Sequence, residues 1–145
     1  MITRIVLAAA VAALGVSVVV AQGDPIAARK ALMKENGNQA RIAREMIEGK
    51  QPFNLAAAKK VLATFADSGK VKTMFPDNSK TGGDTAALPE IWAKKADFDA
   101  KVDKFVADAK AADAQVKDLD SFKAAMGEVG KNCGGCHQPY RKRQS

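Results

Sequence analysis

Histidine and cysteine are scarce in this chain of 145 residues, which has one histidine, His137, and two cysteines, Cys133 and Cys136. All three lie within five consecutive residues near the end of the chain, in the sequence Cys-Gly-Gly-Cys-His. The single histidine excludes any site that needs two imidazoles, and a structural zinc ion, which takes about four ligands, would be one ligand short. No second histidine and no carboxylate pair in a recognisable motif is present, so the sequence does not favour an enzyme.

Charge is almost missing from the start of the chain, where Arg4 is the only charged residue before an apolar run over 5–20. This run of 16 residues is shorter than a membrane-spanning helix, which needs roughly 20. Small or apolar residues stand at the positions that a signal peptidase reads before a cut after Ala21. We predict a signal peptide over 1–21, one exported, periplasmic domain over 22–145, and no stable membrane span after cleavage. An uncleaved anchor is the alternative.

Acidic residues are fewer than basic ones, 16 against 23, which gives a net charge of +7, or +6 once Arg4 is removed with the signal peptide. Such a chain favours acidic partners, anionic lipid or nucleic acid. Lysines alternate with aspartates over 93–117, however, as on the solvated face of a helix. The closing basic cluster at 141–143 is too short to indicate nucleic-acid binding, and export argues against it.

The sequence contains no convincing strand pattern, and its apolar residues recur at helical spacing instead. We predict four helices, over about 24–49, from 54 to about 69, from 89, and from 120 into the closing motif, with N-caps at Asp24, Asn54 and Asp120. A long irregular link is predicted over 75–88, where turn-forming residues are dense. Four amphipathic helices with mostly short links predict an all-α fold, an antiparallel four-helix bundle.

Large apolar side chains are few, with six phenylalanines, one tryptophan and one tyrosine, while alanine is abundant. Because burial contributes roughly 25 cal/mol per Å² of apolar surface, an alanine-rich bundle is only marginally stable on its own contacts. Gly37, inside the first helix, weakens that helix by about 1 kcal/mol relative to alanine, or it lets another group approach the backbone. A large apolar cofactor in the centre of the bundle would supply the missing core.

The closing motif is the attachment sequence for covalent haem, C-x-x-C-H. A disulfide between Cys133 and Cys136 would close a very small loop and stabilise little, and a thioredoxin-like pair needs a βαβ context that is missing. Two thiols three residues apart on a helical turn can each add to one haem vinyl group, and the adjacent imidazole then donates Nε2 to the iron. We predict one haem c attached through both cysteines, with His137 as axial ligand.

The second axial ligand must be methionine, lysine, water or nothing, because the chain has no other histidine. Met126 lies about 16 Å from His137 along the same helix, too far to reach the other haem face. Met33 lies on the first helix, which faces the last one in an antiparallel bundle. Arg29 lies four residues earlier on the same face, where it could reach a haem propionate. Ordinary core packing is the alternative for Met33.

These features resemble class II cytochrome c, the cytochrome c-prime family, which itself exemplifies the four-helix bundle. The ending CGGCHQPYRKR is similar to the family's C-x-x-C-H-x-x-Y-R, and LPEIWAKKADFDAKVDKF at 88–105 is similar to its third-helix signature. ARKALMKENG at 28–37 and FKAAMGEVGKNC at 122–133 resemble the first helix and the approach to the haem site. Pro139 departs from the pattern, and it predicts a kink just after His137 because proline has no N–H.

The resemblance implies a role for each of six residues. It implies thioether bonds at Cys133 and Cys136, with His137 as the proximal ligand. It also implies that Arg29 and Arg141 lie beside the haem and that the side chain of Met33 covers the distal face. Low-spin members of the family ligate methionine and carry electrons, whereas high-spin members leave the iron five-coordinate and bind NO or CO. We expect an electron carrier with Met33 as distal ligand and redox partners that have acidic docking surfaces. The alternative is an NO- or CO-binding protein in which Met33 only packs over the haem. A homodimer is possible, because many relatives pair through their first two helices.

Overall fold

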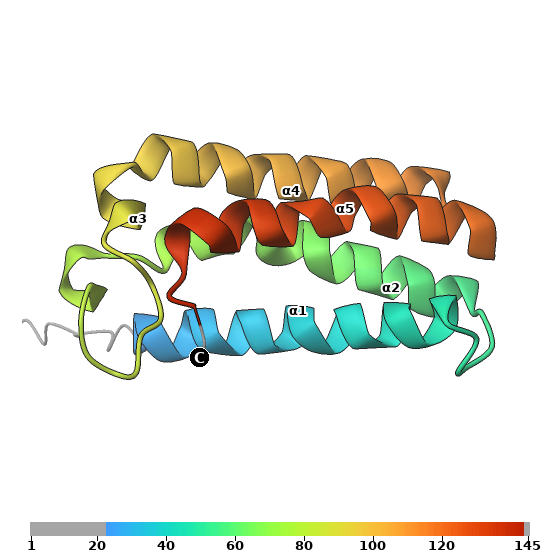
Figure 1. Cartoon of the computed structure of the whole chain (residues 1–145), viewed down its shortest axis with the longest axis horizontal. Coiled ribbons are helices and arrows are strands. Elements are labelled where there is room, and N and C mark those ends of the chain that lie inside the picture. Colours follow the sequence, from blue (N-terminus) through green and yellow to red (C-terminus); the bar gives the residue numbers. More distant parts are fainter. Residues whose placement is uncertain (1–22, 144–145) are drawn as a thin grey trace, which may run out of the picture.

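The computed structural model describes residues 23–143, in which four long helices lie side by side and successive ones run in opposite directions (Figure 1). The long helices are α1 (Pro25–Ile47), α2 (Leu55–Ala66), α4 (Lys95–Gln115) and α5 (Leu119–Tyr140). Helix α4 packs against α2 and α5, and α1 packs against the same two helices. This arrangement confirms the prediction of an all-α, antiparallel four-helix bundle. The predicted signal peptide, residues 1–21, lies outside the described residues.

Side-chain caps begin three of the long helices. The carboxylate of Asp24 accepts a hydrogen bond from the Ile26 amide at 2.8 Å, and Asn54 Oδ1 accepts one from the Ala57 amide at 2.8 Å, as predicted. The prediction that Asp120 caps the last helix was wrong, because α5 begins earlier. Its N-cap is Asp118, whose carboxylate accepts from the Ser121 amide at 2.9 Å, while the Ser121 hydroxyl accepts from the Asp118 amide at 3.0 Å.

The predicted third helix is interrupted near its start. A single turn, α3 (Glu90–Ala93), is separated from α4 by Lys94, whose φ of −123° and ψ of 46° are not helical. Two 3-10 segments precede it, η1 (Asp67–Thr73), which continues directly from α2, and η2 (Asp77–Ser79). The rest of the predicted link is irregular. None of the helices between residues 23 and 143 has the length and apolar character that crossing a membrane requires.

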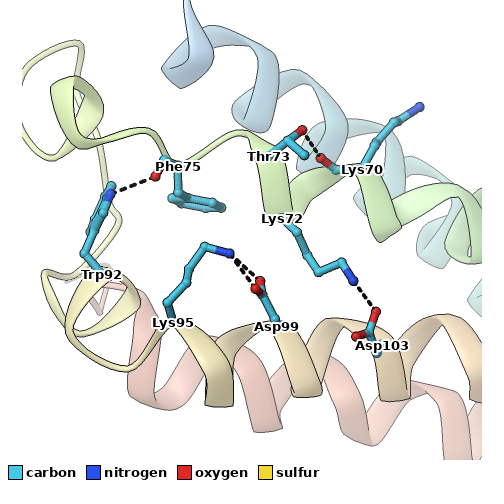
Figure 2. A network of polar contacts seen from close by, with 8 residues as sticks. All are labelled: Lys70, Lys72, Thr73, Phe75, Trp92, Lys95, Asp99 and Asp103. Carbon is cyan, nitrogen blue, oxygen red and sulfur yellow. Dashed lines mark hydrogen bonds and ion pairs between the residues drawn. The ribbon is translucent and has the colours of Figure 1, made fainter.

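Hydrogen bonds tie the link between α2 and α4 to its surroundings (Figure 2). Lys72 Nζ pairs with the Asp103 carboxylate at 2.5 Å, and the Trp92 indole N–H donates to the Phe75 carbonyl at 2.8 Å. The Phe75 ring packs edge-on against both Trp92 and Phe98, with centroids 5.6 and 5.0 Å apart. These contacts fix Phe75 against the start of α4.

The apolar core is divided into two clusters rather than forming one continuous layer. The larger cluster fills the end of the bundle where α1 ends and α5 begins, and it includes Met46, Leu62 and Phe122, all 2% exposed or less. The smaller cluster packs around Phe98 and Tyr140 near the end of α5. A bundle with a divided core leaves space between its helices, and that space is where the closing motif lies.

Candidate haem site

A cavity of about 780 Å³ lies between α1 and α5 and reaches residues of both core clusters. This volume falls within the range of ligand sites, roughly 300–1,000 Å³. Large apolar side chains from α2, the link, α3 and α4 line its wall, among them Phe65, Phe75, Ile91, Phe98, Val102 and Phe105. The cavity therefore has the size and the apolar wall that a planar macrocycle requires.

The α5 wall of the cavity carries the two cysteines and the histidine of the closing motif. Cys133, Cys136 and His137 all line it, because positions three and four apart lie on one face of a helix. Cys133 is exposed, Cys136 is half-buried, and no disulfide joins them. Removal from water raises the pKa of both thiols. Desolvation, followed by the positive charge of Arg141, lowers the pKa of His137 even though its ring is exposed at the cavity. Both effects favour the neutral imidazole, which is the form that binds a metal.

The α1 wall of the same cavity carries Met33, one full turn beyond Arg29. Met33 is 37% exposed and belongs to neither core cluster. Met46, on the same helix, is the core methionine, because it is 2% exposed and packs within the larger cluster. The structure thus brings Met33 and His137 to two walls of one cavity, and core packing does not account for Met33.

The two arginines predicted beside the haem both line the cavity but differ in environment. Arg29 is buried, and its guanidinium donates hydrogen bonds to the link at Met74, Ser79 and Thr85. Arg141 is exposed and follows the last turn of α5, which its amide closes by donating to the His137 carbonyl at 3.0 Å. Contact of either arginine with a haem propionate or ring stays a prediction.

Residues 84–87 of the link form a further wall that the sequence did not predict. They are held to the chain end, because the Lys142 amide donates to the Ala86 carbonyl at 2.8 Å and the Leu88 amide donates to the Tyr140 carbonyl at 3.0 Å. Helix α5 runs past Pro139 and ends at Tyr140, whose side chain is buried. Hydrophobic periodicity predicts helices and strands, so it could not predict hydrogen bonds between this irregular link and the residues after α5.

Two polar contacts brace α5 against α4 on either side of the motif. The Tyr140 hydroxyl donates to the Asp97 carboxylate, and burial followed by this bond raises the pKa of Tyr140 to about 12. Asn132, next to Cys133, donates from Nδ2 to Asp108 Oδ2 at 2.8 Å. Helical spacing placed Tyr140 on the apolar face of the last helix, and the family resemblance included it in the closing motif, but the sequence predicted neither of these two polar contacts.

These residues fit a haem better than an isolated metal ion. Over residues 23–143, no group of three or more histidine, cysteine or acidic side chains gathers as a metal site would require. One imidazole and two thiols stand instead on one wall of an apolar cavity, and a thioether stands on another. Sulfur and imidazole are the side chains by which c-type haem is attached and its iron is ligated.

Comparisons with known proteins agree with this assignment. The family model described as Cytochrome C' matches residues 24–141. Cytochrome c' of Rhodopseudomonas palustris is 45% identical over 143 residues, 98% of each chain, and its cytochrome c-556 is 33% identical over 146 residues, 97% of this chain and 98% of that one. The solved structure of cytochrome c' from that organism matches with a TM-score of 0.82 at 46% identity, over 86% of this chain and 100% of its own. The chain belongs to the cytochrome c' family, whose members bind covalent haem c.

Proposed function

We propose that this haem protein carries single electrons in the periplasm, with His137 on one face of the iron and Met33 on the other. The observation that supports it best is the position of Met33, which lines the cavity of the closing motif and lies outside both core clusters. The bound haem supplies reversible one-electron exchange at iron. Methionine and histidine together raise the reduction potential relative to other axial pairs.

The protein's own residues do the rest of the work. Cys133 and Cys136 tether the cofactor, and the apolar wall around Phe98 and Val102 keeps water away from it. Exclusion of water would lower the local dielectric constant and so favour the less charged state of a bound iron site. Lys30 and Lys34, exposed on α1 at the cavity, add positive charge where a partner would approach. Redox partners with acidic docking surfaces would therefore associate faster, in a salt-sensitive way.

An absorption spectrum of the purified holoprotein tests this proposal, recorded in both oxidation states with and without CO. A six-coordinate low-spin iron gives sharp α and β bands when reduced, and CO does not displace its ligand. A high-spin spectrum that shifts under CO would refute ligation by Met33 while leaving the family assignment intact.

A second candidate is a five-coordinate protein that binds NO or CO, with Met33 only packed over the distal face. The identity to cytochrome c', 45%, exceeds that to cytochrome c-556, 33%, which favours this alternative. Replacing Met33 separates the two candidates, because a side chain that only packs over the haem leaves the spin state unchanged when it is truncated.

Export and assembly belong to the same proposal. We expect cleavage after Ala21, so the intact mass of the exported protein should equal a chain that begins at Gln22 plus one haem. A mass that retains residues 1–21 would indicate an uncleaved anchor instead. Analytical ultracentrifugation distinguishes a monomer from a homodimer, both of which the sequence leaves open.

A further inference from the structure

Arg29 is a buried charge, 5% exposed, with no carboxylate at ion-pair distance among residues 23–143. Its hydrogen bonds go to the link. Nη1 donates to the Met74 carbonyl at 3.0 Å and to Ser79 Oγ at 2.9 Å. Nη2 donates to the Ser79 carbonyl at 2.9 Å and to Thr85 Oγ1 at 2.6 Å. The guanidinium carbon also lies 4.7 Å from the centre of the Phe75 ring.

This donor count limits what else the side chain can bind. A guanidinium has five N–H groups, and a carboxylate is held most firmly by two of them in parallel. The four bonds to the link use every N–H on Nη1 and Nη2, so only the Nε–H is left for a haem propionate. Burial lowers the pKa of Arg29, against the opposing effect of Asp24, and the four acceptors offset the cost of burying the charge.

The part of the link that Arg29 holds has few other attachments. Of residues 77–85, only Ser79 is buried, and the hydrogen bonds that tie this stretch to a helix of the bundle all come from Arg29. Gly82, Gly83 and Asp84 have positive φ values, and apart from the packing of Gly83 against Ile26 they have little apolar surface to bury. Segments with so few buried contacts open at low free-energy cost unless something holds them.

We propose that Arg29 is a positioning residue that clamps residues 74–85 in place as a wall of the haem cavity. Phe75 at one end of this stretch and Thr85 at the other both line the cavity. Residues 86–88 continue from Thr85 to the pairing with the end of α5. The clamp on α1 thus sets the position of the wall that closes the space beside the α5 motif.

Hydrogen exchange of the holoprotein tests this clamp. Arg29→Lys keeps the charge, but a single ammonium cannot span Ser79 and Thr85 as the fork does. Ser79→Ala and Thr85→Val remove acceptors without touching the haem side of Arg29. Thr81→Val is the matched control, because Thr81 is exposed in the same stretch and is not among the four acceptors.

We expect Arg29→Lys, and to a smaller extent Thr85→Val and Ser79→Ala, to speed exchange of the amides at 77–85 by about tenfold or more. Thr81→Val should leave it unchanged. If the amides at 77–85 exchange at the wild-type rate in Arg29→Lys, or in both acceptor variants, the proposal is overturned. That result would favour a simple charge contact between Arg29 and a propionate. If the Arg29 variant does not mature, the two acceptor variants decide the matter.

The inference rests on haem in the cavity but not on Met33 as its ligand. The absorption spectrum of each variant reports ligation by Met33 separately. If the variants exchange like the wild type while the spectrum stays low-spin, the clamp is refuted and ligation by Met33 is not. If the variants exchange faster in a protein with a high-spin spectrum, the clamp is supported and ligation by Met33 is refuted.

Discussion

Replacing Met33 with alanine tests the proposed function most directly, and helix α1 provides its own control. If Met33 is the distal ligand, Met33→Ala removes the only thioether that residues 23–143 place on the cavity wall and leaves the iron five-coordinate. The reduced protein should lose its sharp α and β bands and bind CO. Met46→Ala makes the same chemical change on the same helix, but inside the larger core cluster.

The structure separates the expected stability effects of the two variants. Met46 is 2% exposed, so its truncation leaves a cavity and should cost about 2–5 kcal/mol. That loss lowers the melting temperature by roughly 4 °C per kcal/mol for a domain of this size. Met33 is 37% exposed and outside both clusters, so losing its packing alone should cost only about 1–2 kcal/mol.

The assay is one absorption spectrum and one thermal melt for each holoprotein. We expect Met33→Ala to change the absorption spectrum. We expect Met46→Ala to lower the melting temperature and leave the spectrum unchanged. An unchanged low-spin, CO-inert spectrum in Met33→Ala would refute ligation by this residue. A spectral change of similar size in both variants would show that loosening of the bundle, rather than ligand loss, is responsible.

Three other outcomes are expected. His137→Ala should abolish stable ligation of the haem, and an unaltered absorption spectrum would contradict the role of this imidazole. Expression without a haem-attachment system should give largely unfolded protein by circular dichroism, because a cavity of about 780 Å³ then separates the core clusters; a well-folded apoprotein would show that the cofactor matters less. Tyr140→Phe should remove part of the pH dependence of the free energy of unfolding. The raised pKa of Tyr140 means that its contribution is complete below about pH 10 and is lost as the pH rises towards 12. Equal loss of unfolding free energy in both proteins over that interval would contradict this cause.

Local sequence signals predicted most of the fold because each helix carries its own start signal and apolar stripe. Asp24 and Asn54 cap their helices as expected. The error at Asp120 arose because two aspartates stand two residues apart, and only Asp118 has a serine three residues on that completes the capping box. The break at Lys94 has no comparable signal, since nothing in that stretch forbids a continuous helix.

The part of the candidate site that consists of neighbouring residues in the sequence could be predicted. The motif at 133–137 needs only one helix to present it, and Met33 needs only the antiparallel arrangement of α1 and α5. The wall at 84–87 and the four bonds of Arg29 depend on contacts between residues that are far apart in the chain. The sequence therefore predicted that Arg29 lies at the haem, but it did not predict the acceptors that hold its side chain.

The small side chains of this protein are better understood as part of the site than as a weakness of the core. Gly37 and Ala40 line the cavity on α1, and a Cβ added at Gly37 would meet no atom within 4 Å. A larger apolar side chain at these positions would take up part of the space that a bound haem requires. The same space separates the two core clusters. Because the sequence leaves this space in the bundle, we expect folding of the chain to be coupled to attachment of its cofactor.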